Sequence, residues 1–197
     1  MPYIPVDPTD ISRTYDADVI RVNSQSGKGG IGYLLEQTYG YDLPAKMREH
    51  LSYICKSISD HEHKELKVAE VLEIFENNYF DYKNPVEISE IHFKQLSDGV
   101  EAEVTFMEND KEAKIKAKGN GSLDAVSNAL KSYTNNSYNL TVYKEHSMQS
   151  HGSTSEAAAY ICIQASDGTV YWGAGTHTDI IKASSHALLA AYNNMIR

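Results

Sequence analysis

The sequence predicts an α+β protein in which a helical first part is followed by a βββα arrangement that occurs twice. Three observations lead to this prediction. Apolar residues have the spacing of helices up to about residue 82 and alternate as in strands after Pro85. Three strand patterns and one helix pattern then occur in that order two times. The small and apolar residues of the first of these helices also recur in the second, at an offset of 181 − 123 = 58 residues.

The first part begins with an extended arm and continues into two helices. Prolines at positions 2, 5 and 8 predict an arm with few internal hydrogen bonds. Residues 16–23 alternate loosely and predict a short strand, and residues 24–30 are rich in glycine and predict a loop. Two helical stripes follow, each with a polar opposite face. The stripes are Met47, Leu51, Ile54 and Ile58 in one helix, and Val68, Val71, Leu72, Phe75 and Tyr79 in the other.

After Pro85 the first βββα unit has three strands with one buried and one solvated face. Residues 91–93, 102–106 and 113–117 alternate, and Asn109-Asp110 forms a turn between the last two strands. The lysines at positions 114, 116 and 118 predict the solvated face. A Gly-rich turn ends the third strand, and a helix follows with Leu123, Val126, Leu130 and Tyr133 inward.

The second unit repeats this order. Strands are predicted around Leu140 and Val142, over 157–165 and over 170–174, and Asp179 caps a final helix. The repeated helix pattern supports a tandem duplication, in which each unit buries one sheet face and one helix against the other. The pattern is Leu123-x-Ala125-x-x-x-Ala129-Leu130 in the first unit and Ile181-x-Ala183-x-x-x-Ala187-Leu188 in the second.

The composition excludes several classes of function. With 18 Lys and Arg against 27 Asp and Glu, the net charge is −9, so we expect neither nucleic acid nor an anionic membrane as a partner. The apolar runs are shorter than the ~20 residues of a membrane span, and no signal-peptide core follows Met1. Cys55 and Cys162 are far apart in apolar surroundings, which predicts buried thiols in a cytoplasmic protein. A chain of 197 residues is also too short for a complete (β/α)₈ barrel, which needs about 250.

Three patterns resemble reactive sites but lack the remainder of each motif. Residues 27–30 do not have the spacing of a phosphate-binding loop, so we expect a flexible loop. His61 and His63 are two positions apart and do not share a helix face, so a solvated helix end is favoured over a metal site. His146 and Ser147 lack the Gly-x-Ser-x-Gly context of a nucleophile, and a loop is the favoured interpretation.

Two features are better candidates for ligand binding. Gly119-Asn120-Gly121 opens a helix, where free backbone N–H groups favour a carboxylate or phosphate; the alternative is a plain loop with an N-cap at Ser122. The small residues of 152–160 either leave room for a second backbone, a partner subunit or a small apolar ligand, or pack tightly inside the protein.

Several runs in the chain resemble one known family, in the family's own order and over nearly the whole length. The chain resembles the part of 2-isopropylmalate synthase that follows the catalytic barrel, namely a linker region and the C-terminal regulatory domain. The runs are Tyr3-Ile4-Pro5-Val6-Asp7-Pro8-x-Asp10-Ile11-x-Arg13, Ile20-Arg21-Val22-Asn23-Ser24-Gln25-Ser26-Gly27-Lys28-Gly29-Gly30, Gly119-Asn120-Gly121, Tyr143-x-Glu145-His146-x-Met148, Ala157-Ala158-Ala159-Tyr160, Trp172-Gly173-x-Gly175 and Thr178-Asp179-Ile180-Ile181 with Ala183-Ser184.

The resemblance implies a parent acyltransferase that condenses acetyl-CoA with 2-oxoisovalerate in leucine biosynthesis, using a divalent metal in its barrel. The barrel is absent from this chain, so we expect no catalytic residues, no metal or other cofactor here, and no synthase activity of the chain alone. Residues 1–84 correspond to the linker region and 85–197 to the regulatory domain. In the family, this domain consists of two βββα units, binds leucine as a feedback inhibitor and dimerises. The implied partners are therefore L-leucine, a second copy of the chain and the parent's own barrel.

The family's effector pocket lies near the subunit interface and is transferred here motif by motif. Helix N-terminal amides suit the leucine carboxylate, an acidic side chain or a carbonyl suits the ammonium, and small or apolar residues suit the isobutyl group. Ser122 stands where the family usually has proline, and the loop from Met148 to Ser155 is slightly longer. Three alternatives therefore stay open: a citramalate synthase-like domain that responds to isoleucine, a dimerisation module without an effector, and a free-standing hydrolase. The implied pocket residues are Gly119, Asn120, Gly121, Leu123, Asp124 and Ala125, then Tyr143, Ser147, Ser155 and Ala157, and finally His177, Thr178, Asp179 and Ile180.

Overall fold

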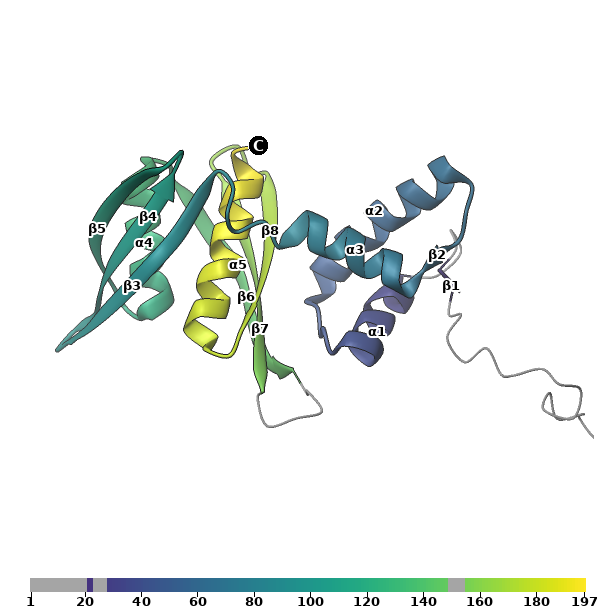
Figure 1. Ribbon diagram of the computed structural model, residues 1–197, viewed down its shortest axis with the longest axis horizontal. Helices are drawn as coiled ribbons and strands as arrows, with labels where there is room; N and C mark the ends of the chain where they lie inside the picture. Colours follow the sequence, from purple (N-terminus) through teal and green to yellow (C-terminus); the bar gives the residue numbers. More distant parts are fainter. Residues whose placement is uncertain (1–20, 23–27, 149–154) are drawn as a thin grey trace, which may run out of the picture.

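A computed structural model describes residues 21–22, 28–148 and 155–197 (Figure 1). The predicted proline arm, residues 24–27 of the predicted glycine-rich loop and residues 152–154 of the small-residue stretch lie outside these ranges. The first part contains the helices α1 (Lys28–Tyr39), α2 (Ala45–Glu62) and α3 (Val68–Tyr79). A short antiparallel pair joins β1 (Arg21–Val22) to β2 (Leu66–Lys67), so the described end of the strand predicted over 16–23 is extended.

The first βββα unit has the predicted order. Strands β3 (Val86–Leu96), β4 (Gly99–Glu108) and β5 (Lys111–Gly119) form one antiparallel sheet, and α4 (Ser122–Thr134) follows. The register places Val104 opposite Ile115 and Glu103 opposite Lys116, so apolar and charged residues occupy opposite faces. Lys116 forms an ion pair of 2.7 Å with Glu103 on the exposed face, which confirms the predicted solvated lysine row.

The second unit repeats this topology with β6 (Tyr138–Met148), β7 (Glu156–Ala165), β8 (Val170–His177) and α5 (Ile180–Met195). The two three-stranded sheets confirm the predicted (βββα)₂ arrangement. His146 and Ser147 lie in strand β6, so the predicted loop at these positions is wrong; the strand is extended because both residues pair with β7, opposite Ala158 and Ala157.

The elements form four layers (Figure 1): the first sheet, the helices α4 and α5, the second sheet, and the helical region. One core lies between the two sheets and includes Val104, Leu130, Ile161 and Leu188. A second core lies on the other face of the second sheet, where Tyr160 and Trp172 pack against α1–α3. Both faces of β7 are therefore covered, which explains why its sequence is a nearly continuous apolar run.

Small residues in the second unit allow α5 to pack very close to its sheet. A Cβ on Gly173 would lie 2.1 Å from the carbonyl oxygen of Ala187, and one on Gly175 would lie 2.4 Å from that of Ala183. Ala158 and Ala159 are fully buried on opposite faces of β7. For these residues the structure favours tight internal packing over space left for a ligand.

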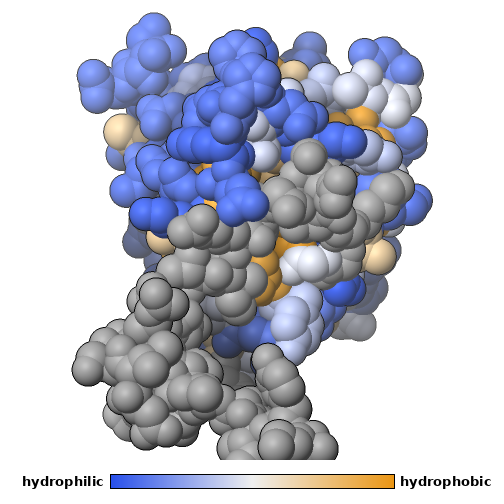
Figure 2. Space-filling model, turned by 90° about the vertical axis from the view of Figure 1, so that its right-hand side faces the viewer, coloured by the Kyte–Doolittle hydropathy of each residue, from blue (hydrophilic) through white to orange (hydrophobic). Residues whose placement is uncertain are grey.

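The helical region contains one helix that the sequence pattern does not predict. Residues Lys28–Gly30 begin α1 and are not a loop, because Ile31, Leu34 and Leu35 form a buried stripe that outweighs the helix cost of the glycines. Gly32 provides close contact with α2, since a Cβ there would lie 2.1 Å from Cδ of Arg48. The visible described surface at this end is mainly hydrophilic (Figure 2).

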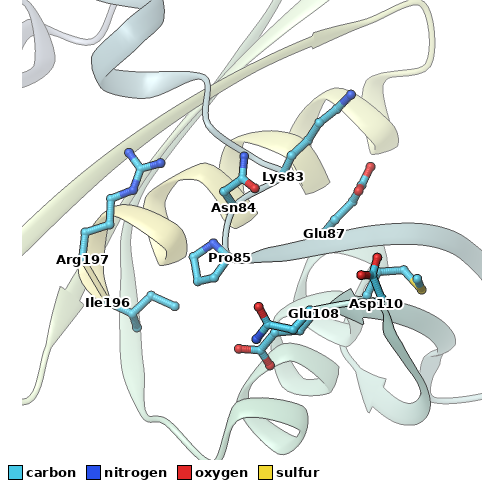
Figure 3. Close-up of a pocket in the computed structure, with 10 residues that line it drawn as sticks. Lys83, Asn84, Pro85, Glu87, Glu108, Asp110, Ile196 and Arg197 are labelled. Atoms are coloured by element: carbon cyan, nitrogen blue, oxygen red, sulfur yellow. The ribbon is translucent and has the colours of Figure 1, made fainter.

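The connection between α3 and β3 is held to the end of α5 by Asn193, which is fully buried. Its side-chain oxygen accepts from the N–H of Val86 at 3.3 Å, and its nitrogen donates to the carbonyls of Val86 at 2.9 Å and Asp81 at 3.1 Å. A cavity of about 620 Å³ lies beside this connection, around Pro85 (Figure 3). It has Lys83 and Arg197 on one side and Glu108 and Asp110 on the other, and it contains none of the predicted pocket residues.

Candidate effector site

The Gly-rich turn between β5 and α4 is held in place by its own backbone. A Cβ on Gly119 would lie 2.3 Å from the backbone nitrogen of Ala125, so only glycine fits there. The N–H of Asn120 donates to Oδ2 of Asp124 at 2.9 Å, which ties the turn to the first helical turn. A shallow cavity of about 280 Å³ lies between this turn and the β3–β4 hairpin, and Gly119, Asn120 and Asp124 help to line it.

Gly121 differs from Gly119, because neither backbone conformation nor packing requires a glycine at this position. Its φ of −154° and ψ of 178° are extended, and a Cβ built on it meets no described atom within 4 Å. Gly121 is the N-cap of α4 and has no side chain to cap the helix, so the alternative of a plain loop with an N-cap at Ser122 is wrong by one residue. The start of α4 therefore has uncapped backbone donors beside open space.

The duplicated position in the second unit has a different cap. Asp179 lies 179 − 121 = 58 residues after Gly121, which is the offset of the helix repeat, and it is the N-cap of α5. Its Oδ1 accepts from the N–H groups of Ile181 at 2.8 Å and Lys182 at 3.4 Å, as the sequence predicted for a helix cap. The two equivalent helix starts therefore differ. In α5 the carboxylate of the N-cap residue binds the first N–H groups of the helix, whereas at α4 the Asp124 carboxylate binds the N–H of Asn120, one residue before the N-cap.

Residues on one face of the second sheet form the other part of the predicted pocket. The register aligns Ser147, Ala157 and His177 in one row across β6, β7 and β8. Tyr143 lies on the same face of β6, and its hydroxyl is 2.9 Å from Oγ of Ser184 on α5. Ser155, just before β7, has its hydroxyl 3.5 Å from the carbonyl oxygen of Met148.

Glu145 is an additional candidate, which belongs to the run Tyr143-x-Glu145-His146-x-Met148 but not to the implied pocket residues. It lies between Tyr143 and Ser147 on the same face of β6, and Tyr143 donates a hydrogen bond to its Oε2. Burial, and then the Glu145 carboxylate, raise the pKa of Tyr143 to about 12, so its hydroxyl keeps its proton at neutral pH. The alternation of strand side chains could have identified Glu145 as a site for an ammonium group.

The segment from His177 to Ile180 leads into α5 and stabilises its own turn. Nδ1 of His177 accepts from the N–H of Asp179 at 2.8 Å and is 3.4 Å from the hydroxyl of Thr178. Ile180 packs against the core between the sheets. This arrangement places the segment at the same end of the second sheet as Ser147 and Ala157.

The predicted residues thus fall into two groups that border one core. Leu123 and Ala125 from the turn group, and Ala157 and Ile180 from the sheet group, all belong to or pack against the cluster between the two sheets. The direct polar contacts described above occur within each group.

The other reactive patterns do not form sites in the described residues. His61 and His63 are at the exposed end of α2, as predicted. His146 and Ser147 are neighbours on a strand, so their side chains point to opposite faces, and Nδ1 of His146 is 3.2 Å from the backbone oxygen of Ser147. Within the described ranges, no three His, Cys, Asp or Glu side chains gather as a metal site would require. None of the described helices has the length and apolar character of a membrane span.

Comparison with known proteins agrees with this architecture. Residues 65–196 match the family described as the LeuA allosteric (dimerisation) domain. The chain belongs to this family. Residues 1–36 match a second family, described as the alpha-isopropylmalate synthase post-catalytic domain-like family.

Relatives of this LeuA-type chain are named 2-isopropylmalate synthase. The protein from Desulfitobacterium hafniense is 45% identical over 197 residues, which is 100% of this chain and 35% of the relative. Those from Helicobacter hepaticus and Agrobacterium fabrum are 42% and 37% identical, over 100% of this chain and 36% and 35% of their own lengths. The chain therefore spans about a third of the length of these relatives.

Proposed function

We propose that this chain is the C-terminal regulatory part of a 2-isopropylmalate synthase and that it binds L-leucine as an allosteric effector. The observation that carries the proposal is the difference between the two helix caps. In α5 the Asp179 carboxylate binds the first N–H groups of the helix, whereas α4 begins at Gly121 with open space in front of it. A leucine carboxylate would occupy at α4 the position that Asp179 occupies at α5.

The sheet group supplies the other features that an amino acid needs. The Glu145 carboxylate and the Tyr143 hydroxyl are partners for an ammonium group, and the small side chain of Ala157, at the core between the sheets, is the proposed neighbour of the branched apolar group. The parent activity, condensation of acetyl-CoA with 2-oxoisovalerate in a metal-containing barrel, belongs to the proposal as well, with feedback inhibition as the function of the present chain. The proposed cellular location is the cytoplasm.

We also propose that the chain forms a homodimer, which the description of its family supports. Three large side chains are more than one-third exposed on the inner faces of the first strands: Phe93 on β3, and Leu140 and Tyr143 on β6. Exposed apolar area of this kind is often covered in an assembly, and a two-fold dimer is the commonest closed assembly. Sedimentation at micromolar concentration tests this, and a monomer there contradicts it.

Calorimetric titration with leucine, isoleucine and valine tests the effector proposal. A leucine-selective binding heat is expected. Selectivity for isoleucine would assign the chain to a citramalate synthase-like parent, and no heat at millimolar concentration would leave only dimerisation as its function. The opposite orientations of His146 and Ser147 argue against the free-standing hydrolase.

A further inference from the structure

Strand β6 contacts different parts of the protein with its two faces. In its second half the odd-numbered side chains Tyr143, Glu145 and Ser147 are exposed on the proposed effector side. The even-numbered side chains Lys144, His146 and Met148 are partly buried and face the helical region. Successive side chains of a strand point to opposite faces. In this half of β6, each residue whose side chain faces the effector side is therefore followed by one whose side chain faces the helices.

The helix-facing side chains hold one short segment, the connection between α1 and α2. Lys144 Nζ forms an ion pair of 2.6 Å with Oδ2 of Asp42. The backbone N–H of Asp42 donates to Nε2 of His146 at 3.3 Å. A Cβ on Gly40 would lie 3.9 Å from Cε of Met148, so the end of this methionine lies beside the same connection.

His146 is fixed in orientation by three groups. Nε2 accepts the N–H of Asp42 at 3.3 Å, and the Tyr160 hydroxyl lies 3.0 Å from the same nitrogen. Nδ1 faces the backbone oxygen of Ser147 at 3.2 Å. The ring stacks beside Tyr160 at a centroid distance of 5.7 Å and an interplanar angle of 19°.

We infer that β6 couples the effector site to the helical region, with Lys144 and His146 as the positioning residues that hold Asp42. The inference rests on the proposed function. The Tyr143 hydroxyl donates to one oxygen of the Glu145 carboxylate, and an ammonium group bound there would add a second, charged donor beside it, so the odd side chains gain a new partner when the effector binds. Because adjacent residues of a strand share one backbone, we expect a shift of Tyr143 or Glu145 to move Lys144 and His146 as well and so to change their contacts with Asp42.

The coupling is reciprocal. An effector can shift the equilibrium between two arrangements of the helical region only by the factor by which its affinities for them differ. A variant that shifts this equilibrium must in turn change the effector affinity, because the coupling is the same in both directions. Two measurements on one set of variants therefore test the inference from both ends: calorimetry for the effector, and amide hydrogen exchange for the segment 40–47, which contains the bonded N–H of Asp42.

The variants are Lys144→Ala and His146→Ala, with His146→Gln as the conservative variant that keeps a side-chain acceptor. Lys116→Ala is the matched control, because it breaks an ion pair of 2.7 Å on the exposed face of the other sheet. The Lys144 side chain is partly exposed, so Lys144→Ala should leave the fold intact. This variant therefore still tests the inference if His146→Ala weakens the fold.

Saturating L-leucine is expected to slow exchange of segment 40–47 in the wild type by about fivefold, the lower end of ordinary coupling. Lys144→Ala and His146→Ala reduce this protection and shift the leucine Kd by the same factor, whereas His146→Gln and Lys116→Ala behave as the wild type. Two results overturn the inference and leave the effector proposal intact. In one, the wild type binds leucine with a measurable heat but amide exchange in segment 40–47 is not slowed. In the other, leucine slows this exchange equally in the wild type and in both alanine variants. No wild-type heat overturns the effector proposal itself, and the inference with it.

Discussion

Replacing Gly121 with aspartate tests whether the open N-terminus of α4 receives the effector carboxylate. The substitution would give α4 the cap that α5 already has, where Oδ1 of Asp179 accepts two backbone N–H groups at 2.8 and 3.4 Å. An Asp cap is worth a few tenths of a kcal/mol over Gly, and its charge adds about 0.3–1 kcal/mol at a helix N-terminus. Asp124 already places a negative charge in this turn, so we expect a net gain of about 0.5 kcal/mol.

The variant should therefore be slightly more stable than the wild type alone but unresponsive to leucine. A gain of this size raises Tm by about 1–2 °C in a protein of this length. Leucine at a hundredfold excess over its Kd stabilises the wild type by about 2.7 kcal/mol, several times more than the added cap. Without leucine the variant melts above the wild type, and with leucine it melts below it; differential scanning fluorimetry measures both values.

Two glycine positions provide controls for this substitution. Gly30→Asp makes the same change in the first turn of α1, where a Cβ also meets no described atom within 4 Å, and should leave the leucine response unchanged. Gly119→Ala should prevent folding because its Cβ would lie 2.3 Å from the backbone nitrogen of Ala125. A full leucine shift in folded Gly121→Asp would refute the assignment of the carboxylate to this helix end.

Four further changes have expected outcomes. Ala157→Leu should abolish the leucine-induced Tm shift and, as overpacking, cost about 1–3 kcal/mol by denaturant titration, whereas a retained shift places the isobutyl group elsewhere. Asp179→Ala removes the α5 cap and should lower stability by about 1 kcal/mol, and no loss would contradict the capping role. Asn193→Ala leaves buried backbone groups at the start of β3 without partners and should cost about 1–3 kcal/mol in urea, where a neutral result would contradict that role. The hydrogen bond from Lys144 lowers the pKa of Asp42 in the folded protein. The pair therefore stabilises the fold above the usual Asp pKa of 3.8, and this stabilisation is lost as the pH falls through the lower pKa of the folded state. Asp42→Asn should flatten this part of the curve of Tm against pH, and an unchanged slope would contradict the stabilising role of the pair.

The βββα repeat was predictable because its signals are local. Alternation in 102–106 and 113–117 follows directly from one buried face, and the helix repeat places Ala125 and Ala183 at fully buried equivalent positions. The cap at Asp179 was predictable for the same reason, since the side chain bonds to the next few residues of its own helix.

Features that depend on tertiary packing were not predictable from these patterns. Helix α1 begins with glycines that disfavour a helix, and only its packing through Ile31 and Leu35 stabilises it. The sequence pattern predicts a strand only around Leu140 and Val142. It does not show that β6 continues to Met148 or which of its faces meets the helical region, because both depend on tertiary contacts such as that with Asp42. The open space beside Gly121 was likewise not predictable. In the sequence Gly121 looks the same as Gly119, whereas in the structure only Gly119 is required by a close backbone contact.

Calorimetric titration of the wild-type chain with L-leucine, with isoleucine and valine in parallel, shows whether the chain binds leucine at the start of α4. We expect a saturable binding heat that is strongest for leucine and is lost in Gly121→Asp while the Gly30→Asp control retains it. The absence of heat with all three amino acids at millimolar concentration, or equal leucine heat in the wild type and Gly121→Asp, would contradict it.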